Sequence, residues 1–272
     1  MIRNITSLGE KEARLLIALR TAGKSIFTFA DAKKVLSSSS ERSIAQMLYA
    51  LTKKRWLRRL EKGKYLILPF EAGEQRTYTA HEFIIAANLI TPCYIGFRSA
   101  LNYYGLTEQV SKTVYVVTDR QKKSLTVDTM TFKFVKLPQR KLFGTTKITI
   151  QEEKINISDK EKTIIDCLDH LEYAGGITEV AKGLWLAKDE LDFGKLISYA
   201  LRIEEKALIQ RLGLLLEYFK LVDEELLASL CQRIGRGYVK LDTLSINQGR
   251  YLSKWYLRVN VPETVLTEWR EH

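Results

Sequence analysis

Residues 39–68, SSERSIAQMLYALTKKRWLRRLEKGKYLIL, decide what kind of domain opens this chain. Ser40 is placed to cap a helix over residues 41–54, because a serine hydroxyl accepts a hydrogen bond from an amide of the first turn. The apolar residues of this helix recur at i, i+3, i+4 and i+7 and form one stripe for burial: Ile44, Met47, Leu48 and Leu51. Beyond the helix, Lys62-Gly63 is typical of a turn between two short strands.

Two further helices are predicted before this stretch. Residues 8–21 place four leucines near one helical face, and Thr28 is placed to cap a helix over residues 29–36. Three helices followed by a basic hairpin is the order of a winged helix-turn-helix. In that arrangement the third helix enters the major groove of DNA, and we expect the hairpin to lie over the phosphate backbone. The sequence therefore predicts a DNA-binding domain over residues 1–72.

The side chains of the third helix and the hairpin match that task. Arg42 can donate two parallel hydrogen bonds to guanine, and Gln46 can pair in the same way with adenine. Short hydroxyl donors, one tyrosine and a run of cations complete the set. The predicted DNA-binding residues are Ser39, Ser40, Arg42, Ser43, Gln46, Tyr49, Lys53, Lys54, Arg55, Arg58, Arg59, Lys62 and Lys64.

The net charge of +11 lies almost wholly in the first quarter of the chain. Residues 1–70 hold 15 Lys and Arg against 5 Asp and Glu, whereas the other 202 residues hold 28 against 27. Such asymmetry indicates a polyanion-binding module joined to a near-neutral one. A basic face that is merely solvated, or that docks an acidic protein as an adaptor, is the alternative at this stage.

Residues 73–272 are predicted to form a second domain in which helices alternate with short strands. Strands are expected over residues 93–95, 114–118, 125–127, 130–137, 145–150, 153–157, 237–241 and 254–259. Helices are expected over residues 83–90, 98–104, 159–171, 177–185, 193–201, 205–219 and 223–233. The fold class is therefore α+β: an N-terminal winged helix-turn-helix, then a larger mixed α/β domain with a small sheet flanked by helices.

Several segments of this second domain carry a resemblance to a known family. They are YIGFRSALNYYGLTEQ (94–109), TVYVVTDRQKKS (113–124), ISDKEKTIIDCLDH (157–170), YAGGITEVAKGLW (173–185), QRLGLLLEYF (210–219) and the stretch from GRGYVKLD to KWYLRVN (235–260). Together they resemble the AbiEi-type antitoxins. These are the antitoxin halves of abortive-infection (type IV) toxin–antitoxin pairs, which act in phage defence.

The resemblance implies a cytoplasmic protein with two tasks. The winged helix would repress its own operon by binding double-stranded promoter DNA, which in such operators carries inverted repeats and accepts two copies, a possible dimer. The domain over residues 73–272 would counter a cognate nucleotidyltransferase-like toxin, with or without a direct complex. The expected contributors to antitoxicity are polar residues of the signature segments: Arg98, Ser99, Asn102, Arg120, Lys122 and Lys123. Tyr94, Phe97, Leu101 and Tyr104 are expected to hold the fold instead.

One enzymatic pattern stands as an alternative. Asp128, with Glu152 or Glu153 and then Lys154, loosely matches the arrangement of a metal-dependent nuclease, in which two carboxylates hold Mg²⁺ and a lysine orients water. The spacing is loose and such residues are common on exposed strands. The interpretation without catalysis is a charged hairpin.

The sequence offers little else that indicates catalysis, a cofactor or a membrane. Three histidines and three scattered cysteines give no metal-ligand spacing and no Cys-x-x-Cys pair, so we expect no metal and no cofactor. Few, unpaired cysteines fit a reducing cytosol. Residues 1–12 lack the apolar core of a signal peptide, and no apolar run approaches the ~20 residues that span a bilayer.

Overall fold

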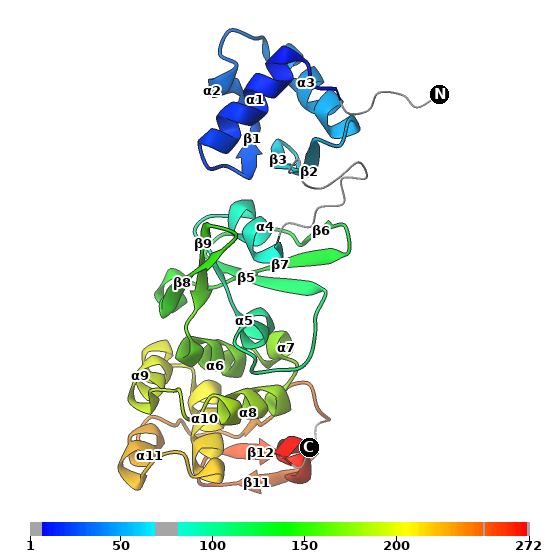
Figure 1. Ribbon diagram of the computed structural model, residues 1–272. Helices are drawn as coiled ribbons and strands as arrows, with labels where there is room; N and C mark the ends of the chain where they lie inside the picture. The colour runs from blue at the N-terminus through cyan, green and yellow to red at the C-terminus, as the bar shows by residue number, and fades with distance from the viewer. Residues whose placement is uncertain (1–6, 69–80, 247, 271–272) are drawn as a thin grey trace. The chain divides into compact units, whose positions relative to one another are not determined.

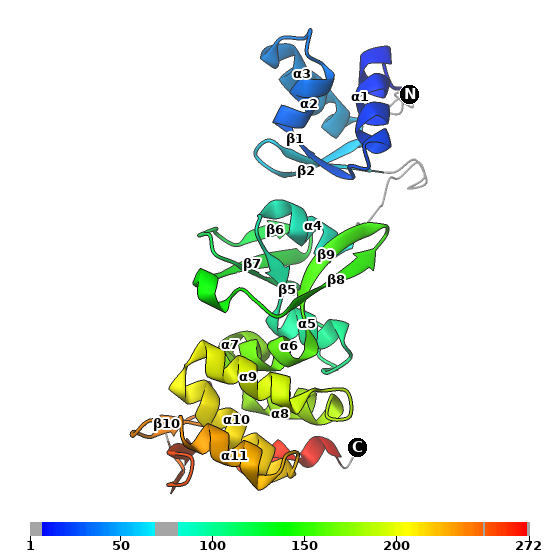
Figure 2. The same ribbon diagram turned by 90° about the vertical axis from the view of Figure 1, so that its left-hand side faces the viewer.

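The computed structural model describes residues 7–68, 81–246 and 248–270 of the 272-residue chain (Figure 1, Figure 2). The backbone divides into two compact units, Met1–His81 and Glu82–His272. The predicted boundary between residues 72 and 73 lies outside the described residues. Within the described ranges, eleven α-helices and three small sheets make this a mixed α/β protein.

The first unit joins three helices to a three-stranded antiparallel sheet. Its elements in chain order are α1 (Glu10–Thr21), β1 (Ile26–Thr28), α2 (Phe29–Val35), α3 (Glu41–Lys53), β2 (Leu57–Glu61) and β3 (Lys64–Ile67). The strand order is β1-β3-β2, so β1 pairs with one strand of the β2–β3 hairpin. The three predicted helices and the hairpin are confirmed. Strand β1 was not predicted, because three residues are too few to show alternation.

Side chains hold both helix starts that the sequence predicts. Ser40 Oγ accepts the amide of Ser43, and Thr28 Oγ1 accepts the amide of Asp31. The Asp31 carboxylate in turn accepts hydrogen bonds from the amide and the hydroxyl of Thr28 and from the Lys24 ammonium. Burial raises the pKa of Asp31, but these hydrogen bonds outweigh it and lower the pKa to about 2. The first unit therefore depends on a carboxylate clamp at the start of α2.

A six-stranded mixed sheet opens the second unit, in the order β6-β7-β5-β4-β9-β8. The strands are β4 (Tyr94–Ile95), β5 (Thr113–Thr118), β6 (Leu125–Val127), β7 (Met130–Lys136), β8 (Thr145–Ile150) and β9 (Glu153–Ser158). Helix α4 (Glu82–Leu89) covers one face, and α5 (Phe97–Tyr103) and α6 (Lys160–Asp169) lie on the other (Figure 1, Figure 2). The predicted strands of this region are confirmed in place and type.

A helical layer continues from α6, and its apolar side chains share one core with the sheet. Its helices are α7 (Leu171–Ala174), α8 (Ile177–Leu186), α9 (Phe193–Ile203), α10 (Lys206–Phe219) and α11 (Glu224–Cys231). A second small sheet follows, with β10 (Val239–Lys240) parallel and β11 (Arg250–Leu252) antiparallel to the central β12 (Leu257–Val259). Three short 3-10 turns complete the unit: η2 (Gln139–Lys141), η3 (Thr264–Leu266) and η4 (Glu268–Arg270).

Three local expectations for the second unit were wrong. The helix expected over residues 159–171 ends at Asp169, because His170 leaves the helical conformation. The strand expected over residues 254–259 is limited to Leu257–Val259, because residues 253–256 form a turn in which the amide of Tyr256 donates to the carbonyl of Ser253. Strand β11 was not expected, because residues 250–252 are too short and polar to show a strand pattern.

Candidate nucleic-acid interface

The outward face of α3 carries the side chains that the sequence assigns to base contacts. Arg42, Gln46, Tyr49 and Lys53 fall at i, i+4, i+7 and i+11, so they share one side of the helix, and all four are exposed. The opposite side buries Ile44, Leu48 and Leu51, while Met47 is half-buried at its border. A 13-residue helix is ~20 Å long. This face is therefore a straight polar strip long enough to follow a groove of DNA.

An aromatic side chain occupies the middle of this strip. Tyr49 is 65% exposed, and Lys53 Nζ lies 5.5 Å from the centroid of its ring. Ser40 and Ser43 are exposed at the start of the helix and Ser39 is half-buried beside them. The amide of Ser43 is already satisfied by Ser40, so these serines offer hydroxyl groups rather than free amides at that point. The geometry suits contacts with bases from Arg42 and Gln46 on the outward side of α3 and with phosphates from the serine hydroxyls at its start.

The β2–β3 hairpin adds a second group of cations next in the chain. Arg59 and Lys62 are exposed, and Arg58 is half-buried. Gly63 closes the turn with φ +75°, a left-handed conformation that favours glycine. Its carbonyl accepts the amide of Phe29 at 2.8 Å, so the turn is anchored at the start of α2. The tip of the hairpin is therefore fixed where its cations can meet a flat anionic surface.

Ion pairs inside the first unit concentrate its excess positive charge. Four of the five acids of residues 1–70 are engaged by lysines, in the pairs Lys24–Asp31, Lys33–Glu41, Lys54–Glu12 and Lys64–Glu61. Two predicted DNA-binding residues, Lys54 and Lys64, are thus partly neutralised within the protein. Within residues 7–68, Arg42 and Lys62 enter no ion pair. Exposed cations lie on α3 (Arg42, Lys53), at its exit (Arg55) and on the hairpin (Arg59, Lys62), but also on α1 (Lys11, Arg14, Arg20) and α2 (Lys34).

The predicted antitoxicity residues divide into two groups. Three of them make hydrogen bonds to the backbone of the second unit. Arg98 Nε donates to the carbonyl of Ala174, Lys122 Nζ donates to the carbonyl of Leu89, and Ser99 Oγ accepts a hydrogen bond from the amide of Tyr115. Ser99 is also buried, which removes it from any surface. The other three are exposed, Asn102 on α5 and both Arg120 and Lys123 between β5 and β6. The second group holds the candidates for contact with a partner.

The signature segments of the second unit pack against one another. Tyr94 OH donates to Asp166 Oδ2 at 2.9 Å, and Tyr104 OH donates to the carbonyl of Ser158 at 2.8 Å. Gly175 lies so close to Arg98 that an added Cβ would fall 2.0 Å from Nη2. Tyr94, Phe97 and Leu101 are buried and Tyr104 is half-buried, which confirms that these four side chains hold the fold.

A buried ion pair lies at the centre of this packing and was missed by the sequence reasoning. Lys162 donates to Asp166 one turn along α6 and to Tyr94 OH at 3.2 Å. Burial, with Asp166 next, raises the pKa of Tyr94 well above its ordinary value, so its hydroxyl keeps its proton and donates. Asp159 caps α6 by accepting the amide of Lys162, while the Ser158 hydroxyl is paired with Thr163. Charged residues at i and i+4 inside an apolar helical run were the available signal.

The structure does not bring together the carboxylates of the nuclease-like pattern. Asp128 lies in the β6–β7 turn at one edge of the six-stranded sheet, and Glu152 lies in the β8–β9 turn at the other. At least three strand spacings of ~4.8 Å separate them. A shared metal ion is incompatible with that arrangement. Across the described residues, no group of three or more His, Cys, Asp or Glu side chains is placed to hold a metal.

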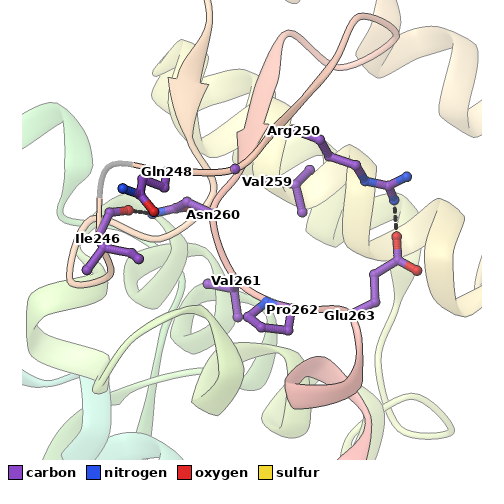
Figure 3. A pocket seen from close by; sticks show the side chains of 9 residues that line it. Ile246, Gln248, Arg250, Val259, Asn260, Val261, Pro262 and Glu263 are labelled. Carbon is purple, nitrogen blue, oxygen red and sulfur yellow. Dashed lines mark hydrogen bonds and ion pairs between the residues drawn. The ribbon is translucent and has the colours of Figure 1, made fainter.

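An open hollow of about 570 Å³ lies beside β11 and the end of β12 (Figure 3). Its charged groups satisfy each other, since Arg250 pairs with Glu263. Asn260 Nδ2 donates to the carbonyls of Asp242 and Ile246, so it braces the loop before β11. The remaining wall is mostly apolar and consists of Ile246, Gly249, Val259, Val261 and Pro262, with the polar Gln248 at one side. The hollow therefore lacks a set of polar side chains that point at one place where a ligand could bind.

Comparison with solved structures shows a likeness in fold. The chain is similar over 98% of its length to a crystal structure of the RV2827C protein from Mycobacterium tuberculosis, covering 97% of that chain, with a TM-score of 0.64 and 12% identity. At that identity the likeness concerns the fold alone. No family model matches this chain, and no curated protein matches it. Among the helices described, none is both long enough and apolar enough to cross a membrane.

Proposed function

We propose that the first unit is a winged helix-turn-helix that binds double-stranded promoter DNA. The element order α1-β1-α2-α3-β2-β3 and the pairing of β1 with β3 support this, because they match a winged helix-turn-helix in which α3 would be the recognition helix and β2–β3 the wing. The observation that carries the proposal is the exposed strip Arg42, Gln46, Tyr49 and Lys53, followed along the chain by hairpin cations whose nearby acids are already paired.

We further propose that the whole chain is a cytoplasmic autorepressor and antitoxin of the AbiEi type. The support is the resemblance of the signature segments together with their mutual packing through Tyr94, Arg98 and Asp166. Residues that a family keeps for its fold are expected to contact one another in this way. In this proposal the second unit counters a nucleotidyltransferase-like toxin, and Asn102, Arg120 and Lys123 are the exposed side chains offered to that task.

DNA binding is tested with the purified full chain and a fluorescent duplex taken from the region upstream of its own gene. If α3 and the hairpin neutralise about five phosphates, the logarithm of the association constant falls with the logarithm of salt concentration at a slope of about −4.5. Lys62→Glu should weaken binding and flatten that slope. Lys147→Glu, the same change on exposed β8 of the second unit, is the matched control. A slope near zero, or equal effects of both variants, would favour a protein-binding adaptor.

Antitoxicity is tested by expressing the full chain with its cognate toxin from an unrelated promoter, so that loss of repression does not change toxin dose. A chain with Arg42→Ala and Lys62→Glu should lose operator binding and still rescue growth. A chain with Arg120→Glu and Lys123→Glu should retain operator binding and rescue less well. If rescue follows DNA binding in every variant, the proposal of two separable tasks is wrong.

A further inference from the structure

The outward face of the small sheet in the second unit gathers tyrosines and cations in one row. Lys240 on β10, Arg258 on β12 and Tyr251 on β11 are direct cross-strand neighbours in the register. Direct neighbours across a sheet point to the same side. The alternate positions Leu257 and Val259 are buried against the core. The row Lys240–Arg258–Tyr251 therefore faces solvent.

Two more tyrosines extend this row into an aromatic cluster. The ring centroids of Tyr238 and Tyr251 lie 4.8 Å apart, and those of Tyr238 and Tyr256 lie 5.5 Å apart. Tyr238 is 46% and Tyr251 56% exposed, so their rings are only partly covered by protein. Arg258 stacks on Tyr251 with its guanidinium carbon 4.8 Å from the ring centroid and donates to its hydroxyl. A hollow of about 190 Å³ lies between these side chains.

The charge around this face has one sign. Residues 233–260 hold six Lys and Arg and a single acid, Asp242. Asp242 is buried and accepts the amides of Ile177 and Leu244, so it does not neutralise the surface. Arg250 and Lys254 are paired with Glu263 and Glu217 away from the row. Arg236 and Lys240 add two cations to the aromatic face beside Arg258, whose guanidinium lies against Tyr251.

Helix α10 holds the backbone of this face rigid from behind. Gln210 Nε2 donates to the carbonyls of Gly237 and Tyr256, and Arg211 donates to the carbonyl of Lys240. Both side chains are buried. Trp255 packs against the backbone of α10 at Gly213. A ligand would therefore meet preformed rings, with little conformational entropy lost on binding.

We propose that this face binds single-stranded RNA, with bases stacked on Tyr238 and Tyr251 and phosphates held by Arg236, Lys240 and Arg258. Exposed aromatic rings beside cations are the chemistry of single-strand binding, because every base has a face that can stack. Duplexes keep their bases stacked inside, whereas the unpaired bases of RNA loops and ends are open to aromatic and Arg side chains. The site is independent of the DNA contacts proposed for the first unit.

The test is fluorescence anisotropy of an end-labelled eight-nucleotide oligouridine RNA titrated with the full chain. Tyr251→Ala and Tyr238→Ala should each weaken binding by about 5- to 150-fold, the range for loss of one base stack. Tyr251→Phe should bind like the wild type, because it keeps the ring. Tyr103→Ala removes a tyrosine of similar exposure, 43%, from α5 and should leave RNA binding unchanged. With three phosphate contacts the salt slope should be about −2, and Lys240→Glu should make it shallower.

Five results would overturn the proposal. The first three are wild-type RNA binding by both Tyr251→Ala and Lys240→Glu, a comparable loss in Tyr103→Ala, and duplex RNA bound as tightly as the single strand. The fourth is displacement of the RNA by polyglutamate as effective as by unlabelled RNA, which would indicate an acidic protein partner. Tighter binding of oligodeoxyuridine than of oligouridine would overturn the choice of RNA over DNA. Thermal unfolding of each variant checks that it is folded. If the alanine variants do not fold, RNA binding by Tyr251→Phe and by Lys240→Glu is compared instead, and the proposal requires wild-type binding by the first and a shallower salt slope in the second.

Discussion

Lys162 and Asp166 form an ion pair one turn apart on α6, with side chains 0% and 1% exposed. Tyr94 completes the group by donating to Asp166 and accepting from Lys162. Removing both charges from water is costly, and their attraction offsets this cost only while the pair is intact. The pair therefore fixes how the signature segments meet rather than adding large net stability.

Replacing only one residue of this ion pair should destabilise the fold far more than replacing both residues together. Lys162→Met leaves the Asp166 carboxylate buried and uncompensated and should lower the free energy of unfolding by about 3–5 kcal/mol. Lys162→Met combined with Asp166→Leu should restore most of that loss. Urea unfolding of the second unit, followed by circular dichroism, measures both. Equal losses in the single and double variants would mean that the side chains act by shape alone.

Asp31 should make the stability of the first unit depend on pH in the acidic range. Its pKa of about 2 in the folded protein lies below the ordinary 3.8, so its contribution is present above pH 4 and is lost as the pH falls through about 2. Asp31→Asn should cost about 1–2 kcal/mol at pH 7, and the difference should disappear as the pH falls below about 2. Hydrogen exchange of the α2 amides, corrected for intrinsic rates, reports the difference. Glu10→Gln, an exposed change on α1, should show no such dependence.

Substitutions in α3 and in the hairpin should have different effects on DNA binding, because the first would remove base contacts and the second phosphate contacts. Arg42→Ala should reduce the preference for operator over random DNA by about 1–3 kcal/mol, because a bidentate contact to guanine carries sequence information. Arg59→Ala should weaken both DNAs alike, since phosphate contacts carry none. Competition binding with the two duplexes measures each ratio. An Arg59→Ala variant that lost operator binding alone would show that the hairpin is placed wrongly.

Gly213 and Trp255 should be energetically coupled. An added Cβ at Gly213 would fall 2.0 Å from Cζ3 of Trp255, which must then move within a packed core. Gly213→Ala should cost about 1–3 kcal/mol by overpacking. Trp255→Leu destabilises by leaving a cavity and losing the hydrogen bond to Glu217. The double variant should lose less than the sum of the two, and strict additivity in thermal unfolding would contradict the contact.

The sequence determined the local elements of this protein. Helix α3 follows from Ser40 and from the spacing of Ile44, Leu48 and Leu51, and β5 and β7 follow from β-branched and aromatic runs. The concentration of cations in the first unit also follows from the sequence, because charge is a property of composition. These features depend on residues near each other in the chain, which is why periodicity and capping predict them.

Only the tertiary structure decided which distant residues meet. The sheet order separates Asp128 from Glu152 and excludes a metal site shared by the two. The sequence around each residue does not indicate this separation. The burial of Lys162 with Asp166 depends on Tyr94, 68 residues away from Lys162. The face of Tyr238, Lys240, Tyr251 and Arg258 exists because β11 pairs with β12, and β11 has no strand signal of its own. Long-range pairing is stabilised by contacts that a single stretch of sequence does not contain, so it cannot be read from that stretch.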